Sequence, residues 1–297
     1  MEYILETENL TKVYKGKYCV NDVSIHIEKG DIYGFIGKNG AGKTTVMRLI
    51  LGLAKPTRGK IKLFGSDKLN EGRKRIGSLI EAPGLYKNCS AKENMKRFSI
   101  LYGGTDKEID ELLSFVGLNN VGNKKVGQFS LGMKQRLGIA VALLGNPEFL
   151  VLDEPINGLD PEGIKEIRDL LLKLNSEKGV TIMISSHILD ELAKITTVYG
   201  IINNGVMVEE IKAKDLQELC RNNIIVSCDK PNEAKELLQE KLNLTNIEIC
   251  NDTLKISGDI ESVDEVNSIL VKNDIKVHEI TIDKTSFENF FIERVGK

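Results

Sequence analysis

An octapeptide near the start of the chain constrains its fold more than any other feature. It runs Gly37-Lys38-Asn39-Gly40-Ala41-Gly42-Lys43-Thr44 and matches the pattern G-x-x-x-x-G-K-[ST] at every fixed position. The apolar segment 31–36 before it predicts a buried strand, and the segment 45–51 after it predicts a helix. In this context the pattern forms a loop whose backbone N–H groups point at phosphate oxygens, and the helix N-terminus adds partial positive charge. A plain glycine-rich turn is the alternative, and the match at every fixed position argues against it.

The same segment identifies the residues that we expect to bind a nucleoside triphosphate. Lys43 is expected to reach the β- and γ-phosphates, and the Thr44 hydroxyl is expected to bind Mg²⁺. The expected nucleotide-binding residues of this segment are Gly37, Lys38, Asn39, Gly40, Ala41, Gly42, Lys43, Thr44 and Thr45.

Composition and charge exclude several other classes of protein. The 297 residues include 41 Lys or Arg and 43 Asp or Glu, so there is no global positive field for nucleic acid or an anionic membrane surface. We therefore expect no nucleic-acid partner, and we expect the short basic run 73–75 to be solvated. The five cysteines, Cys19, Cys89, Cys220, Cys228 and Cys250, form no C-x-x-C pair, as expected of free thiols in a reducing compartment.

The sequence gives no sign of a segment that enters a membrane. No apolar run reaches the roughly 18 residues that a membrane-spanning helix needs. The first residues lack the basic and apolar regions of a signal peptide. We therefore expect any work at a membrane to require another polypeptide.

The order of the predicted elements indicates an α/β nucleotide-binding domain over residues 1–215. Strands are expected at 3–7, 19–27, 31–36, 61–65, 75–80, 149–152 and 180–185, a helical part at about 87–145, a helix at 164–174, and a hairpin around Asn203-Asn204-Gly205. In the helical part, Ser90 is expected to cap a helix, with Glu93 completing a capping box. Strands that alternate with helices around a phosphate loop favour a parallel sheet covered on both faces.

Residues 222–297 predict a second, smaller domain. Strands are expected at 223–228, 245–250, 253–257 and 276–282, with helices at 232–242 and 263–273 and a last helix from Ser286. The order β-α-β-β-α-β is that of a small α+β ferredoxin-like domain. A docking or dimerisation role is favoured over ligand sensing, for which only Ser257-Gly258-Asp259 is suggestive.

Two carboxylates end the apolar strand 149–152. Asp153 is placed to hold Mg²⁺, because a hard cation prefers oxygen ligands. Glu154 is the natural residue to polarise an attacking water. Such a pair can also be solvated surface, but its place a domain's length after the phosphate loop favours the catalytic interpretation.

Between these two sites lies Phe129-Ser130-Leu131-Gly132-Met133-Lys134-Gln135-Arg136, which resembles the signature motif of ATP-binding cassette (ABC) ATPases. Asn157-Gly158-Leu159-Asp160 resembles their D-loop and His187 their switch histidine, and Tyr14 lies where the family stacks an aromatic ring on adenine. Each motif occurs once and in the family's order, over about residues 3–212.

The resemblance implies a P-loop NTPase (ABC ATPase) domain with helical and antiparallel β subdomains, which binds ATP and Mg²⁺ and hydrolyses the ATP. It implies that Lys43, Glu154 and His187 are catalytic. It also implies that Ser130 and Gly132 contact the γ-phosphate held by a second copy of the chain, so that ATP would draw two copies into a homodimer. His26 and His278 have no such setting and are expected to be structural.

Two departures from the family pattern narrow the resemblance further. Leu131 and Met133 replace a glycine and a glutamine of the usual signature. Glu81 stands where the family has a glutamine near Mg²⁺, which implies a third residue at the metal. The segment 78–86 and the signature segment together resemble the bacitracin- and lantibiotic-export subfamily. Glu81 as a neutral replacement at a tolerant position remains the alternative.

That subfamily resemblance implies an ATPase that lies peripherally on the cytoplasmic face of the cell membrane and powers a separate membrane permease. The export of a peptide antibiotic or related amphiphile would confer self-protection or resistance. The alternative is a soluble ABC ATPase with a role at ribosomes or DNA. The single uninterrupted cassette, without sustained heptads or a basic face, argues against it.

Overall fold

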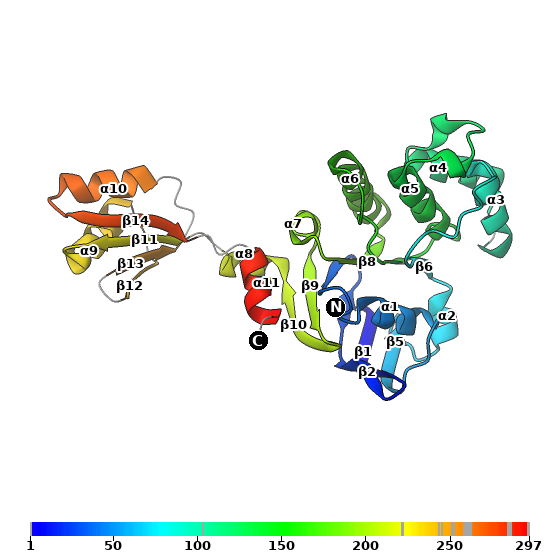
Figure 1. The fold of residues 1–297 in the computed structure, drawn as a ribbon, viewed down its shortest axis with the longest axis horizontal. Helices are drawn as coiled ribbons and strands as arrows, with labels where there is room; N and C mark the ends of the chain where they lie inside the picture. Colours follow the sequence, from blue (N-terminus) through cyan, green and yellow to red (C-terminus); the bar gives the residue numbers. More distant parts are fainter. Residues whose placement is uncertain are drawn as a thin grey trace. The chain divides into compact units, whose positions relative to one another are not determined.

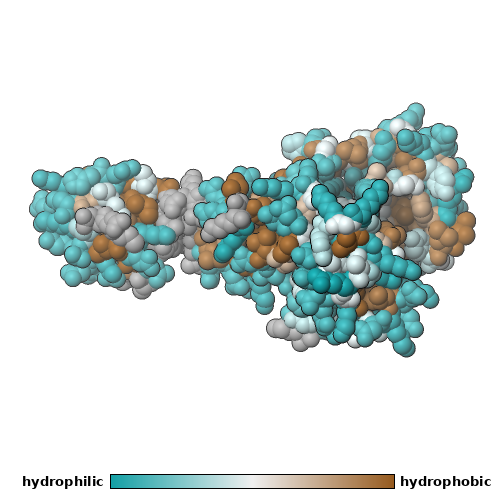
Figure 2. Space-filling model, turned by 60° about the horizontal axis from the view of Figure 1, so that its bottom comes forward, coloured by the Kyte–Doolittle hydropathy of each residue, from teal (hydrophilic) through white to brown (hydrophobic). Residues whose placement is uncertain are grey.

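A computed structural model describes residues 2–102, 104–220, 223–242, 244, 246–250, 253–257, 263–283 and 287–295. The chain divides into two compact units, Met1–Ala213 and Lys214–Lys297. The face seen in Figure 2 is mostly hydrophilic, with hydrophobic residues in separate patches. Within the described residues, every helix is too short or too polar to span a lipid bilayer.

A six-stranded sheet lies at the centre of the first unit, in the order β10-β9-β4-β8-β7-β6 (Figure 1). Its strands are β4 (Ile32–Ile36), β6 (Ile76–Leu79), β7 (Phe149–Leu152), β8 (Thr181–Ser186), β9 (Val198–Asn203) and β10 (Val206–Lys212). Strands β4, β7 and β8 are buried at every residue, which accounts for the continuous apolar sequence of β7 and the largely apolar first residues of β8. All neighbouring pairs are parallel except β9 and β10, so five strands end at the same edge.

A second, antiparallel sheet is built around the long strand β1 (Tyr3–Tyr14). Strand β1 pairs with β2 (Lys17–Val23), β3 (His26–Glu28) and β5 (Arg58–Leu63). The expectation of one strand over 19–27 is wrong, because residues 24 and 25 separate β2 from β3. Within β2, Asp22 takes a left-handed backbone conformation with φ 53°. The strand expected at 3–7 continues to Tyr14.

Helices cover the central sheet and form a helical subdomain. Helix α1 (Lys43–Leu51) shares one apolar core with residues of β1, β4 and β7. The subdomain contains α3 (Ala91–Tyr102), α4 (Asp106–Phe115) and α5 (Leu131–Ala142), which lie together in Figure 1. The remaining helices of this unit are α2 (Leu69–Arg73), α6 (Pro161–Lys178) and α7 (Leu189–Leu192), and short 3₁₀ turns span Asn119–Val121 and Val126–Gln128.

The capping box expected at the start of α3 is confirmed. Ser90 N donates to Glu93 Oε2 at 2.6 Å, and Glu93 N donates to Ser90 Oγ at 3.2 Å. In the basic run 73–75, Lys74 and Arg75 are exposed, as expected, and Arg73 is half-buried. Arg73 Nε donates to the carbonyl of Ile50 at 3.0 Å, and Arg75 forms a two-bond ion pair with Glu148.

The second unit contains the expected β-α-β-β-α-β order. Its elements are β11 (Asn223–Cys228), α9 (Pro231–Leu242), β12 (Ile247–Cys250), β13 (Thr253–Ser257), α10 (Val263–Lys272) and β14 (Val277–Asp283), with α8 (Ala213–Leu219) before them and α11 (Phe287–Val295) after them. The sheet order β12-β13-β11-β14, with every neighbouring pair antiparallel, confirms the ferredoxin-like arrangement. Both α9 and α10 bury apolar residues against this sheet. Gly258, Asp259 and Ser286 lie outside the described residues.

Candidate site for nucleotide binding and hydrolysis

The phosphate loop connects β4 to α1, and two of its glycines are required by close contacts. A Cβ atom at Gly37 would lie 2.5 Å from the carbonyl oxygen of Ile202. One at Gly42 would lie 2.7 Å from the carbonyl oxygen of Cys19, and the φ of Gly42 is +109°. Because Gly42 is the N-cap of α1 and has no side chain, the first-turn N–H groups of this helix lack a side-chain cap. Such N–H groups are well suited to bind an anion.

Lys43 places a buried ammonium group at the centre of the loop. Its Nζ donates to the carbonyls of Gly37, at 2.6 Å, and Lys38, at 3.4 Å. The same atom lies 3.3 Å from Glu154 Oε1, and only 6% of the Lys43 side chain is exposed. The loop therefore wraps around a fixed positive charge.

Asp153 is held by two hydroxyl groups. Thr44 Oγ1 donates to Asp153 Oδ2 at 2.7 Å, and Ser185 Oγ donates to Asp153 Oδ1 at 2.6 Å. Asp153 is 3% exposed. The Thr44 hydroxyl and the Asp153 carboxylate thus bring hard oxygen ligands together, the type that Mg²⁺ prefers.

Glu154 contacts both of the other residues expected to be catalytic. Its Oε1 faces Lys43 at 3.3 Å, and its Oε2 lies 2.8 Å from His187 Nδ1. Its backbone N donates to Ser185 Oγ at 2.9 Å, and its φ of 49° lies in the left-handed region. This conformation turns the carboxylate at the strand end toward the phosphate loop.

The parallel sheet explains why residues so distant in sequence converge here. Leu152 pairs with Ile184, so Asp153 and Ser185 are adjacent just beyond that pair. Ile36, the last residue before the phosphate loop, pairs with Ser186. The carboxyl ends of β4, β8 and β7 therefore bring the loop, His187 and the two acids to one edge, as is typical of ligand sites in parallel α/β sheets.

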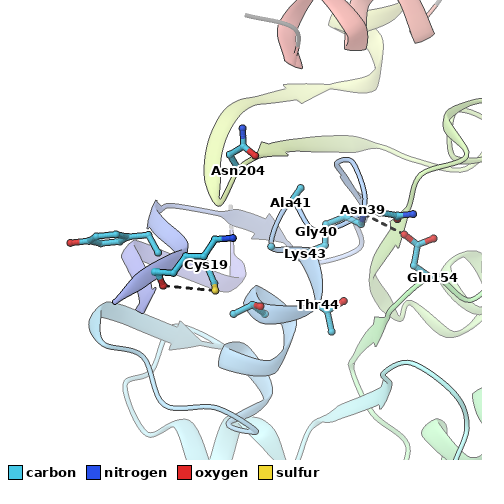
Figure 3. A pocket seen from close by; sticks show the side chains of 12 residues that line it. Cys19, Asn39, Gly40, Ala41, Lys43, Thr44, Glu154 and Asn204 are labelled. Atoms are coloured by element: carbon cyan, nitrogen blue, oxygen red, sulfur yellow. Dashed lines mark hydrogen bonds and ion pairs between the residues drawn. The ribbon is translucent and has the colours of Figure 1, made fainter. Parts of the chain in front are cut away.

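A cavity of about 390 Å³ opens over the loop. Figure 3 shows the labelled loop residues from Asn39 to Thr44 between Cys19 on one side and Glu154 on the other. The lining also includes Lys17, Tyr18 and Asn204, which sequence reasoning missed. The hairpin turns at Lys15-Gly16 and Asn204-Gly205 were the available signals.

Tyr14 lies outside this lining. Its side chain is 46% exposed, and Lys12 Nζ lies 4.7 Å from the centre of its ring. The ring is therefore accessible for stacking, but the aromatic residue from this hairpin that lines the cavity is Tyr18.

The signature residues line a different cavity, of about 470 Å³. Ser130 is the N-cap of α5, and its Oγ accepts a hydrogen bond from Met133 N at 3.2 Å. Gly132 faces Leu159 and Gly163 at the start of α6, and Leu131 is 44% exposed. Lys43 lines the first cavity and Ser130 the second, so one chain keeps the two groups of residues in separate places.

Glu81 follows β6, and its carboxylate is hydrogen-bonded to neither Thr44 nor Asp153, the two residues expected to bind Mg²⁺. Its carboxylate forms an ion pair with the guanidinium of Arg48 on α1. The Glu81 side chain is 64% exposed, and its φ of 61° is left-handed.

Comparisons with known proteins agree with this geometry. A family model described as ABC transporter matches residues 20–157. The bacitracin transport ATP-binding protein BcrA of Enterococcus faecalis is 41% identical over 300 residues, covering 100% of this chain and 97% of that protein. The lantibiotic transport ATP-binding protein SrtF of Streptococcus pyogenes is 45% identical over 225 residues, covering 75% of this chain and 98% of that protein.

The solved structures agree as well. The dimeric ATP-binding cassette MJ0796, in a post-hydrolysis state with ADP and Pi, has a TM-score of 0.64 and 28% identity, covering 70% of this chain and 98% of that one. The expected α/β fold of an ABC ATPase is thus confirmed. The chain belongs to the ATP-binding proteins of ABC transporters and is an ATP-hydrolysing subunit of that family.

Proposed function

We propose that this ATPase powers a separate membrane permease that exports a peptide antibiotic or a related amphiphile, and thereby protects the cell. The observation that carries the proposal is similarity over the whole chain to a bacitracin transport protein. The lantibiotic relative covers 75% of the chain, so the bacitracin relative also shares residues of the C-terminal unit. Bacitracin-like peptides are therefore the first substrates to test.

The proposed hydrolysis depends on the carboxylate of Glu154. Water placed beside the γ-phosphate would give a proton to Glu154, whose carboxylate is oriented by Lys43 and His187. Lys43 would bind the β- and γ-phosphates, because its ammonium is already fixed inside the loop. His187 would donate a hydrogen bond to the γ-phosphate or to the water.

We further propose that Mg²⁺ accompanies the nucleotide. Thr44 and Asp153 fit such an ion, because their oxygens lie 2.7 Å apart and face the phosphate loop. When bound, the ion would neutralise charge on the β- and γ-phosphate oxygens. Glu81 would join these residues only when the nucleotide and its ion are present, since a third carboxylate near Asp153 and Glu154 is otherwise repelled.

A complete site would require a second copy of the chain. Ser130 and Gly132 lie in a cavity that lacks Lys43, so they would meet the nucleotide bound to the partner copy. The dimeric state of the similar cassette MJ0796 supports this arrangement. We also propose that Tyr14 stacks on adenine and that the dimer lies on the cytoplasmic face of the membrane, beneath the permease.

The experiment that tests this function is a drug-sensitivity assay in the cell that carries the gene. Deletion should lower the minimal inhibitory concentration of bacitracin, and the native gene should restore it. A gene carrying Glu154→Gln should not restore it, although the protein accumulates. Unchanged sensitivity to bacitracin and to lantibiotics after deletion would refute the proposed export.

A further inference from the structure

We propose that Arg48 is a positioning residue that binds Glu81 in the nucleotide-free protein and releases it to the metal site when Mg-ATP binds. The ion pair between the two side chains is the observation that carries this inference. The inference rests on the proposed role of Glu81 at the metal, and it adds the residue that competes for that carboxylate.

Helix α1 presents the metal ligand and the competing cation on one face. Thr44 and Arg48 are four residues apart, so they lie one turn apart on the same side of the helix, about 6 Å along its axis. Thr44 donates to Asp153, and Arg48 binds Glu81. Glu81 is therefore held beside the metal-binding oxygens rather than on them.

The loop that carries Glu81 is fixed at both ends. At its start, Asp153 N donates to the carbonyl of Leu79 at 2.8 Å. At its far end, the buried amide of Asn94 accepts from Tyr86 N at 2.8 Å and donates to the carbonyl of Tyr86 at 3.1 Å. The Arg48–Glu81 pair lies between these anchors, so loss of the pair loosens the backbone between them without dismantling the loop.

The ion pair between Arg48 and Glu81 forms in the nucleotide-free protein but is weak enough for Glu81 to leave Arg48 at little energetic cost. The side chains of Arg48 and Glu81 are 42% and 64% exposed, and ion pairs this exposed contribute little to stability. The guanidinium of Arg48 remains charged at every physiological pH, so Arg48 does not release Glu81 by losing a proton. A divalent cation at Thr44 and Asp153 would offer the Glu81 carboxylate twice the charge of the guanidinium. A glutamine at position 81 could not form this ion pair, so the device depends on the carboxylate of Glu81.

The first test uses hydrogen–deuterium exchange of the nucleotide-free full chain. Arg48→Gln and Glu81→Gln should each increase exchange of the amides between residues 82 and 87 by about two- to fivefold, the range expected for an exposed ion pair. The double variant should show no further increase. Arg58→Gln is the matched control, because it breaks an Arg–Asp pair of similar exposure with Asp22 on the other sheet. Unchanged exchange in Arg48→Gln, or additive effects in the double variant, would overturn the pairing.

The second test measures the affinity of a non-hydrolysable ATP analogue with Mg²⁺ and with EDTA. Arg48→Gln should increase the ratio of the two affinities by about two- to fivefold, because Glu81 no longer has to leave a partner. With Glu81→Gln in the background, Arg48→Gln should leave the ratio unchanged. If Arg48→Gln changes both affinities equally, the competition does not exist, although the proposed ATPase function stands. A chain that binds no analogue under either condition would instead refute the proposed function.

Discussion

Ser185 donates a 2.6 Å hydrogen bond to Asp153 and so fixes the carboxylate whose other oxygen accepts from Thr44. The same hydroxyl oxygen accepts from Glu154 N at 2.9 Å. One serine on β8 thus orients both acids at the end of β7. Asp153 is a proposed ligand of Mg²⁺, and a residue that orients a metal ligand is commonly almost as important as the ligand itself.

We predict that Ser185→Ala will raise the Mg²⁺ concentration that ATP hydrolysis requires. Loss of the hydrogen bond frees the Asp153 carboxylate to rotate, so the Mg²⁺ concentration for half-maximal activity should rise about 10- to 100-fold. A titration of activity against Mg²⁺ at saturating ATP measures this shift. Ser78→Ala on β6 is the control and should leave the curve in place. An unchanged curve for Ser185→Ala would show that Thr44 alone orients Asp153.

The features that the sequence predicts correctly depend on contiguous residues. The phosphate loop, the buried strands β4, β7 and β8, and the capping box at Ser90 and Glu93 are each specified within a few positions. The ferredoxin-like order of the second unit follows from six short elements in a fixed sequence. In these cases the local pattern is enough to identify each element, although the strands themselves are stabilised by pairing with strands distant in the sequence.

The features that sequence reasoning missed depend on contacts between distant segments. Ser185 becomes a site residue only because the register of β7 and β8 places it beside Asp153. Arg48 becomes the partner of Glu81 only because β6 ends near α1. The break between β2 and β3 depends on how each strand pairs with β1, for which the alternating pattern at 19–27 contains no signal.

We predict that Glu154→Gln will abolish most hydrolysis and preserve ATP binding. The amide keeps the size of the side chain but cannot accept a proton from water, and removal of a general base commonly slows turnover about 10²- to 10⁴-fold. Phosphate release and binding of a fluorescent ATP analogue measure the two properties separately. A turnover rate equal to that of the native protein would remove Glu154 from the mechanism.

ATP should draw two copies of the chain together, because Lys43 and Ser130 line separate cavities of one copy. Glu154→Gln protein, which we expect to retain ATP, should elute as a dimer with Mg-ATP and mainly as a monomer without nucleotide. Adding Lys43→Ala should abolish the dimer, since it removes the charge that binds the phosphates. Elution as a monomer at every ATP concentration would contradict the shared site.

The last prediction concerns the buried phenol of Tyr33, which donates a 2.8 Å hydrogen bond to Glu210. Burial, and next the negative charge of Glu210, raises the pKa of Tyr33 well above the usual 10. Below pH 10 the phenol is neutral in both the folded and the unfolded chain, so it adds no pH dependence. Above pH 10 it ionises only in the unfolded chain, so the free energy of unfolding should fall by up to about 1.4 kcal/mol per pH unit from this group.

Tyr33→Phe should remove that contribution and leave a shallower decline above pH 10. Near neutral pH the substitution should lower the free energy of unfolding by about 0.5–1.5 kcal/mol, because Glu210 loses one hydrogen bond. Glu210 keeps its contacts with the backbone N and Nδ1 of His26. Urea unfolding between pH 8 and about 11 measures both effects. Tyr18→Phe, which changes an exposed phenol, is the control and should follow the native curve. If the free energy of unfolding of Tyr33→Phe falls as steeply above pH 10 as that of the native chain, the Tyr33 phenol ionises in the folded chain. In that case burial and the contact with Glu210 do not keep the phenol neutral.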